Sequence, residues 1–385
     1  MKIAVRLLVI YVVAVVLLLG SASSARSDHV DDVITVQMRE RDIPGVALAV
    51  IRESRVIREQ SYGFADKEKN VPVTSSTLFQ GASVSKSIAA IGALHLVEQG
   101  KLSLDENVNA KLRHWKVPEN RFTKNHPVTL RLILSHSAGL SVHGFPGYRV
   151  GAPIPSLVQI LDGQLPANSK PIRVDHIPGS QWSYSGGGFV VMQQMMIDVT
   201  GRSFADYMDE TVLKPLGMSS STFGQPLSEA WERRAATGHT EAPRRAVEGR
   251  WRVHPELAAA GLWTTAGDLA RFLIGIQRSL AGTSNPVISR SMTRQMLTKQ
   301  DGDSGLGIML GGTPLRFGHN GDNVGFNAVT IAFETGEGAV ILMNANTDIE
   351  ALKNILVEAI GDQYHWPGYP LSHEKSDHAK QHSHE

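Results

Sequence analysis

One serine in the sequence has neighbours that suit it for nucleophilic chemistry. Ser83 follows Gly81-Ala82, and Lys86 comes three positions later in a run to Gly100 with a helical pattern. Residues three apart on a helix have Cβ atoms about 5–6 Å apart, so a hydroxyl and an amine there can share a proton. Free N–H groups and the helix dipole in the first turn also favour developing negative charge. The pair predicts an activated nucleophile; the alternative is a helix-capping serine beside a surface lysine.

Two other segments contain residues that could complete such a site. Tyr184 lies in a small-residue loop just before a predicted helix, and an adjacent ammonium such as that of Lys86 favours the phenolate. His319 lies where we expect a strand to end, among glycines that let the backbone approach a ligand closely. It can donate a hydrogen bond or a proton there. The alternative for Tyr184 is an aromatic side chain that only packs against its loop, and the alternative for His319 is a histidine with a structural role.

The elements that must position these residues come from both ends of the chain. We expect a helix over 27–41, a hairpin of strands over 46–51 and 56–64, strands over 315–317, 325–333 and 339–344, and a last helix over 348–360. Helical patterns and loops alternate in between. The economical arrangement is an α/β (α+β) domain. An antiparallel sheet of five or more strands would be flanked by helices, and a large, mainly helical insertion would lie beside it.

The three segments, in this chain order, resemble the motifs of the serine β-lactamase and penicillin-binding-protein superfamily, in its class C, D-aminopeptidase and family VIII esterase branch. The motifs stand here as Ser83-Val84-Ser85-Lys86, Tyr184-Ser185-Gly186 and His319-Asn320-Gly321. The segments 134–140 and 261–272 also resemble the family, and the resemblance runs from about residue 30 to 362. It implies a β-lactamase/transpeptidase-like fold.

The resemblance also implies roles for these residues. Ser83 would attack a carbonyl carbon, while Lys86 and Tyr184 accept and return the proton. The oxyanion would lie between the backbone N–H groups of Ser83 and of Asp322, which follows Gly321. His319 would take the place of a family lysine, and an imidazole that is neutral at pH 7 anchors a substrate carboxylate more weakly or in a pH-dependent way.

Gly186 departs from the β-lactamase pattern, which has Asn at this position. The family's Asn offers its amide to the substrate and to the active-site lysine, and glycine has no side chain with which to do so. We therefore expect ester or peptide hydrolysis rather than efficient β-lactam hydrolysis. Three further histidines, His136, His239 and His254, are interpreted as structural, because their spacing does not suggest a metal site.

Together these features predict a serine hydrolase that acts through an acyl-enzyme on esters or amides, including D-amino-acyl peptides, without cofactor or metal. One alternative is a β-lactamase or D-Ala-D-Ala carboxypeptidase. A second is a penicillin-binding sensor that deacylates slowly, and a third is a pseudo-enzyme that uses its cleft for protein interaction. The sequence leaves the oligomeric state open.

The amino-acid composition limits the kinds of molecule that the protein is expected to bind. The 385 residues are 42% hydrophobic and 19% charged, with a formal net charge of +1, which gives no basic field for nucleic acid. A small ester, peptide or β-lactam is the expected partner. The chain contains no cysteine, so disulfides and thiol chemistry are excluded.

Both ends of the chain have compositions unlike the rest. Lys2 and Arg6 precede an apolar run over 7–19 and small residues up to Ala25, which predicts a secretory signal peptide over 1–25. We expect an exported protein, periplasmic or secreted, that can associate peripherally with the cell envelope; an uncleaved N-terminal anchor is the alternative. Residues 27–365 are predicted to form one domain, with its α/β part over 27–100 and 300–362 and its insertion over 101–299. The His-rich tail over 370–385 is predicted to be disordered.

Overall fold

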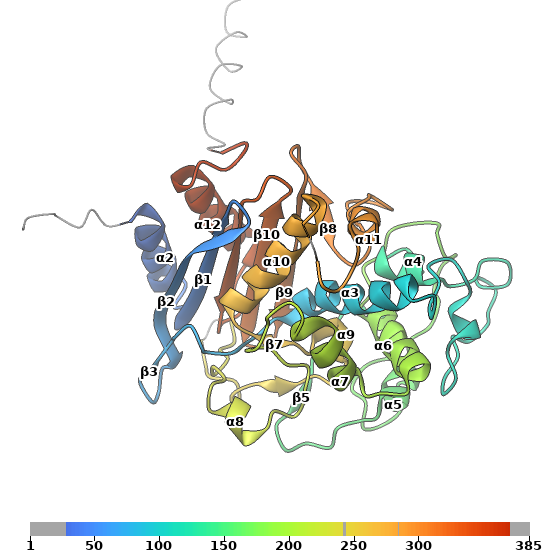
Figure 1. Cartoon of the computed structure of the whole chain (residues 1–385). Coiled ribbons are helices and arrows are strands. Elements are labelled where there is room, and N and C mark those ends of the chain that lie inside the picture. The colour runs from blue at the N-terminus through green and yellow to red at the C-terminus, as the bar shows by residue number, and fades with distance from the viewer. Residues whose placement is uncertain (1–27, 242–243, 284, 370–385) are drawn as a thin grey trace, which may run out of the picture.

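The computed structural model describes residues 28–241, 244–283 and 285–369 (Figure 1). The predicted signal peptide and the predicted disordered tail lie outside the described residues. Within the described part of the chain, no helix is long and apolar enough to cross a membrane.

A seven-stranded antiparallel sheet forms the centre of the molecule, in the order β3-β2-β1-β11-β10-β9-β8. The strands are β1 (Gly45–Arg52), β2 (Arg55–Asp66), β3 (Val71–Pro72), β8 (Met309–Gly311), β9 (Arg316–Asn323), β10 (Phe326–Phe333) and β11 (Gly338–Met343). β1 pairs with β11, with Val46 opposite Met343, so the two ends of the chain meet in the middle of the sheet. The predicted sheet built from both chain ends is confirmed.

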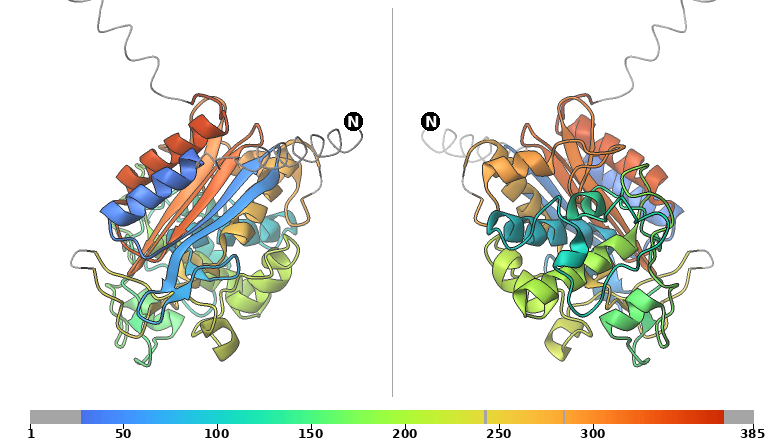
Figure 2. Two further views of the ribbon diagram at one scale, coloured as in Figure 1. Left: turned by 90° about the vertical axis from the view of Figure 1, so that its left-hand side faces the viewer. Right: turned by 90° about the vertical axis from the view of Figure 1, so that its right-hand side faces the viewer.

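Helices cover both faces of this sheet. α2 (His29–Glu40) and α12 (Ile349–Gln363) lie side by side on one face, where Ile34 and Leu352 belong to the same apolar cluster (Figure 2). α10 (Ala266–Leu280) packs on the other face against β1, β2, β10 and β11. The pattern assigns 266–280 to the helical insertion, whereas in the structure this helix is part of the cover of the sheet. With both faces covered, seven of the eight residues of β1 are buried.

The helical part lies beside the sheet. It contains α4 (Leu130–Leu134), α5 (Leu157–Asp162), α6 (Gly186–Thr200), α7 (Phe204–Met208), α8 (Glu229–Glu232) and α9 (Leu257–Ala260), while α11 (Arg290–Met296) precedes β8. Two small strand pairs, β4 (Phe79–Gln80) with β7 (Trp263–Thr264) and β5 (Tyr148–Arg149) with β6 (Arg252–Val253), join its loops.

α3 (Ser85–Glu98) runs between the sheet and the helical part, preceded by a 3-10 turn, η1 (Ala82–Val84). It contacts α9 and α6 and is buried on nearly all sides, with Ile88, Ile91 and Leu94 fully buried. Gly100, with φ +68°, follows its end. The predicted helix is confirmed, except that Ser83 lies in the 3-10 turn rather than in the α-helix itself.

β9 is longer than the sequence predicts. His319, Gly321 and Asp322 lie within the strand and not at its end, because β9 pairs with β10 from Arg316 to Asn323. Pairing with a central strand overrides the low strand preference of the glycines.

Candidate active site

Ser83 and Lys86 form a partly buried hydrogen-bonded pair. Lys86 Nζ donates to Ser83 Oγ at 2.9 Å and to the carbonyl oxygen of Ala259 at 2.8 Å. The lysine is only 2% exposed. Ala259 belongs to α9, so this short helix fixes the direction in which the amine reaches the serine. The geometry is that of an activated nucleophile and not of a surface lysine near a capping serine.

The turn that carries Ser83 has an unusual backbone. Ala82 has φ +47° although it is not a glycine, and such a conformation costs of order 1–3 kcal/mol unless its surroundings impose it. Ser85 supplies part of that constraint. Its hydroxyl donates to the carbonyl oxygen of Ala82 at 2.5 Å and accepts the N–H of Leu262 at 3.0 Å. The middle serine of the motif therefore braces the turn, a role that sequence reasoning missed.

Tyr184 lies next to this pair, just before α6. Lys86 Nζ is 5.0 Å from the centroid of its ring. Within the described residues the tyrosine hydroxyl makes no hydrogen bond, so its predicted part in proton transfer rests on proximity. The structure thus brings together all three residues predicted to be catalytic.

His136 positions the tyrosine. Its ring stacks on Tyr184 with centroids 4.3 Å apart and planes 25° apart. Its Nδ1 accepts the N–H of Ser185 at 3.1 Å, so the neutral ring carries its proton on Nε2. Burial lowers the pKa of His136 well below its usual value, with the charge of Lys86 adding to the effect. The sequence interpretation of His136 as structural is correct in kind but missed that it supports a site residue.

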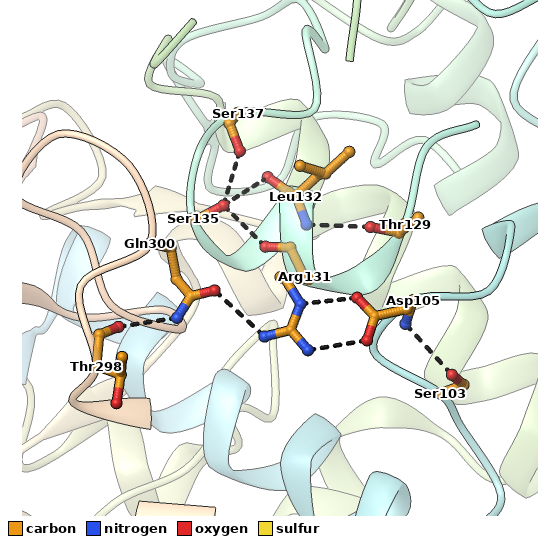
Figure 3. Close-up of polar contacts among 9 residues, drawn as sticks. All are labelled: Ser103, Asp105, Thr129, Arg131, Leu132, Ser135, Ser137, Thr298 and Gln300. Carbon is orange, nitrogen blue, oxygen red and sulfur yellow. Dashed lines mark hydrogen bonds and ion pairs between the residues drawn. The ribbon is translucent and has the colours of Figure 1, made fainter. Parts of the chain in front are cut away.

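The turn around His136 is tied to the rest of the protein by a polar network (Figure 3). Arg131 forms a two-point ion pair with Asp105, with N···O distances of 2.7 and 2.9 Å, and its Nη1 also donates to Gln300 at 3.2 Å. Ser135 Oγ donates to the carbonyl oxygen of Arg131 at 2.9 Å and lies 2.8 Å from Ser137 Oγ. The residues on either side of His136 are thereby held to α4.

His319 faces the same region from β9, with its ring centroid 6.1 Å from that of Tyr184. Burial lowers its pKa to about 4, and the charge of Lys86 contributes. Its Nδ1 lies 2.5 Å from the carbonyl oxygen of Asn320, so the neutral ring donates there and leaves Nε2 as a buried acceptor without a partner. In this state the free ring nitrogen of His319 accepts a hydrogen bond rather than donating one.

Gly321 lets β9 approach the nucleophile turn. A Cβ at this position would lie 2.4 Å from the carbonyl oxygen of Gly81 and 3.1 Å from Ala82 Cβ. The backbone that leads into Asp322 therefore runs directly against the turn that carries Ser83, as the predicted oxyanion site requires. The Asp322 side chain accepts from Asn346 Nδ2 at 2.6 Å, and burial raises its pKa.

Gly186 is the first residue of α6, and its missing side chain has a structural reason. A Cβ there would lie 2.9 Å from the carbonyl oxygen of His143 and 3.1 Å from the ring of Phe145. The N–H of Gly186 donates to the same carbonyl at 3.0 Å. The loop over 141–145 thus occupies the space into which an asparagine side chain would extend.

A second group of titratable residues lies buried near α9. His254 is fully buried with neither ring nitrogen hydrogen-bonded, and burial lowers its pKa to about 3. Glu256 precedes α9, and burial raises its pKa to about 8. Neither carboxyl oxygen has a hydrogen-bond partner, although Tyr148 is close enough to perturb it. The glutamate was not predicted, since nothing in its sequence context indicates burial.

No group of three or more His, Cys, Asp or Glu residues in the described ranges is arranged to hold a metal ion. His239 is buried, and its Nδ1 lies 3.0 Å from the carbonyl oxygen of Asn344.

An antiparallel sheet with a helical part beside it carries a partly buried Ser–Lys pair next to a tyrosine where the two meet, an arrangement that fits a serine hydrolase with an activated nucleophile. The comparison with protein families agrees. Residues 30–361 match the Beta-lactamase family model, and the chain belongs to the beta-lactamase family.

Relatives align over part of the chain. "Protein flp" of Staphylococcus aureus (strain NCTC 8325 / PS 47) is 24% identical over 206 residues, which are 51% of this chain and 38% of the relative. "Esterase EstB" of Burkholderia gladioli is 31% identical over 223 residues, which are 56% of this chain and 55% of the relative. The aligned part thus spans about half or less of each relative's length.

Solved structures resemble nearly the whole fold. An octameric penicillin-binding protein homologue from Pyrococcus abyssi superimposes with a TM-score of 0.70 at 23% identity, over 86% of this chain and 76% of that one. A D-amino acid amidase from Ochrobactrum anthropi SV3 gives 0.68 at 21%, over 87% and 99%. A class C beta-lactamase gives 0.68 at 23%, over 86% and 94%. These similarities establish the fold.

Proposed function

We propose that the protein is a serine hydrolase that cleaves ester or amide bonds through an acyl-enzyme. The observation that carries the proposal is the hydrogen bond from the buried Lys86 Nζ to the partly exposed Ser83 Oγ, with Tyr184 beside the amine. A serine hydroxyl is a weak nucleophile by itself, and a neighbouring amine or phenolate that accepts its proton makes it reactive.

In this mechanism Ser83 Oγ attacks the substrate carbonyl carbon while its proton passes to the Lys86–Tyr184 pair. The carbonyl oxygen gains negative charge, which the N–H groups of Ser83 and Asp322 stabilise. The tetrahedral intermediate then expels the alcohol or amine, which takes up the proton, and leaves the acyl group on Ser83. Water then attacks that ester and gives up a proton to the same pair. The second tetrahedral intermediate releases the acid, and the pair returns the proton to Ser83 Oγ.

Esters and amides, including D-amino-acyl peptides, are favoured over β-lactams. Gly186 has no amide to offer, and the loop over 141–145 occupies the space beside it. Two similar proteins are named an esterase and a D-amino acid amidase, in keeping with this preference. β-Lactamase or D-Ala-D-Ala carboxypeptidase activity is the second candidate, supported by the fold shared with a class C beta-lactamase.

The test compares Ser83→Ala with Ser75→Ala, which changes an exposed serine. Hydrolysis of 4-nitrophenyl butyrate and covalent labelling by a fluorophosphonate are expected to disappear in Ser83→Ala and persist in Ser75→Ala. Labelling that survives in Ser83→Ala contradicts the proposal. Repeated turnover distinguishes an enzyme from a slowly deacylating sensor, which gives one burst and a stable adduct in the mass spectrum.

We also propose that the protein is exported, to the periplasm or beyond, and associates peripherally with the cell envelope. The support is the signal-peptide pattern over residues 1–25. A mature N-terminus near residue 26 in protein recovered from a periplasmic extract is the expected result. Full-length protein that fractionates with the membrane after a salt wash supports the uncleaved anchor instead.

A further inference from the structure

A pocket of about 540 Å³ opens between two loops of the helical part, which we call the loop pocket. One loop contributes residues 141–144 and Pro146, the other residues 168–171, Arg173 and Asp175. The volume is large enough for a small organic group. The motifs found in the sequence do not include any of its charged residues.

Hydrogen bonds fix both ends of the loop pocket. At one end Ser141 and Arg173 are joined by two bonds, from Ser141 N–H to the carbonyl oxygen of Arg173 and from Arg173 N–H to Ser141 Oγ, both at 2.8 Å. At the other end Asn168 donates through Nδ2 to the carbonyl oxygen of Gly147 at 2.8 Å and through N–H to Tyr148 Oη at 3.2 Å. The pocket is therefore preformed by its two loops.

The loop pocket adjoins the candidate active site. The ring of His143, one of its lining residues, has its centroid 4.7 Å from that of Tyr184. The same loop is bonded to the start of α6, where the N–H of Gly187 donates to the carbonyl oxygen of Val142 at 2.9 Å. His143 and its loop therefore connect the pocket to Tyr184.

The charges of the lining favour an anion. Its permanent cations are Lys170 and Arg173, against one carboxylate, Asp175. Arg173 already donates to two carbonyl oxygens, at 2.8 and 3.3 Å, and lies 3.6 Å from Asp162, which is outside the lining. Lys170 is exposed and has no ion pair or hydrogen bond within the described residues. The hydroxyl of Ser169, beside it in sequence, is buried without a partner.

We propose that the loop pocket is the subsite for a carboxylate on the substrate, which Lys170 binds as an ion pair. The proposal rests on the proposed hydrolase function and narrows its substrates to esters or amides with an acidic group beyond the scissile bond. Lys170 is a specificity residue in this scheme and takes no part in the bond-breaking steps.

The test uses two matched pairs of esters. 4-Nitrophenyl pentanoate and mono-4-nitrophenyl glutarate differ by a carboxylate on the acyl group, and phenyl acetate and 4-acetoxybenzoate differ by one on the leaving group. Lys170→Met is expected to raise KM about three- to tenfold for the charged member of one pair, with kcat unchanged, as removal of one partly screened charge contact predicts. The KM values of the neutral esters stay the same. The pair that responds shows which end of the substrate occupies the pocket.

Two further variants sharpen the result. Asp175→Asn is expected to lower KM for the same charged ester, because it removes a repulsive carboxylate from the lining. Lys101→Met removes an exposed lysine just beyond the far end of α3 and should change neither pair, which controls for the overall charge of the protein. Equal KM ratios of charged to neutral ester in wild type and Lys170→Met, for both pairs, overturn the proposal. Loss of the proposed function is a separate outcome, in which the neutral esters are not cleaved in a Ser83-dependent way.

Discussion

Three consecutive glycines at the start of α6 provide a graded test of how tightly the active-site wall is packed. A Cβ added at Gly187 would lie 2.3 Å from the carbonyl oxygen of Ser141, and one at Gly186 would lie 2.9 Å from that of His143. At Gly188 the nearest atom is 3.5 Å away, an ordinary van der Waals distance. The same substitution to alanine should therefore have three different consequences within one helical turn.

The magnitudes follow from two opposing effects. Alanine is preferred over glycine in a helix by up to about 1 kcal/mol, whereas overpacking costs about 1–3 kcal/mol and sometimes more. Gly188→Ala meets no obstacle and should leave the free energy of unfolding unchanged or raise it by up to about 1 kcal/mol. Gly186→Ala should lower it by about 1–2 kcal/mol. Gly187→Ala should lower it by about 3 kcal/mol or more, since a backbone oxygen cannot move aside as a flexible side chain can.

Urea unfolding followed by circular dichroism measures these differences directly. KM for a neutral ester, measured in parallel, reports whether displacement of the loop over 141–145 disturbs the site. Gly186→Asn, which introduces the β-lactamase residue, is expected to destabilise the protein further without creating efficient β-lactam hydrolysis. Equal stabilities of Gly187→Ala and Gly188→Ala would show that the described packing of this wall is wrong.

Three further predictions concern the site and its buried titratable groups. Gly321→Ala should push β9 away from Ser83, because its Cβ would lie 2.4 Å from the carbonyl oxygen of Gly81. The value of kcat for ester hydrolysis should then fall about 10²–10³-fold, while the far-UV circular dichroism spectrum stays that of the wild type. Burial raises the pKa of Glu256 to about 8, so the folded state holds a proton that the unfolded state releases above about pH 4.5, and the free energy of unfolding falls as pH rises from there to about 8. Between pH 5 and pH 8, Glu256→Gln should therefore gain at least about 1 kcal/mol in the free energy of unfolding relative to wild type. Equal pH dependence of urea unfolding in the two proteins would contradict this. Burial lowers the pKa of His319 to about 4, which keeps its ring neutral from pH 5.5 to 8. The pH profile of kcat/KM over that range should therefore have the same shape in His319→Gln as in wild type. An inflection near pH 6.5 that is present in wild type and absent in the variant would show that His319 titrates there.

Much of the fold is readable from local pattern. The continuous apolar run of β1 and the helical spacing of apolar residues in α3 are local patterns of the sequence, and both elements form as predicted apart from their ends. The extent of β9 is different. Its glycines indicate a strand end, and only pairing with β10 carries the strand on to Asn323. Likewise the role of α10 as cover for the sheet depends on packing between segments far apart in the chain.

For the site, the sequence by itself determined the residue types and their order: Ser83, Lys86 and Tyr184, with Gly186 and His319 as departures from the family pattern. The spacing of Ser83 and Lys86 on one helical turn already places hydroxyl and amine in reach. Only the tertiary structure decided that Ala259 orients the amine, that His136 stacks on the tyrosine and that a loop occupies the space beside Gly186. Burial and contacts between distant segments set these features, and a linear sequence does not record either.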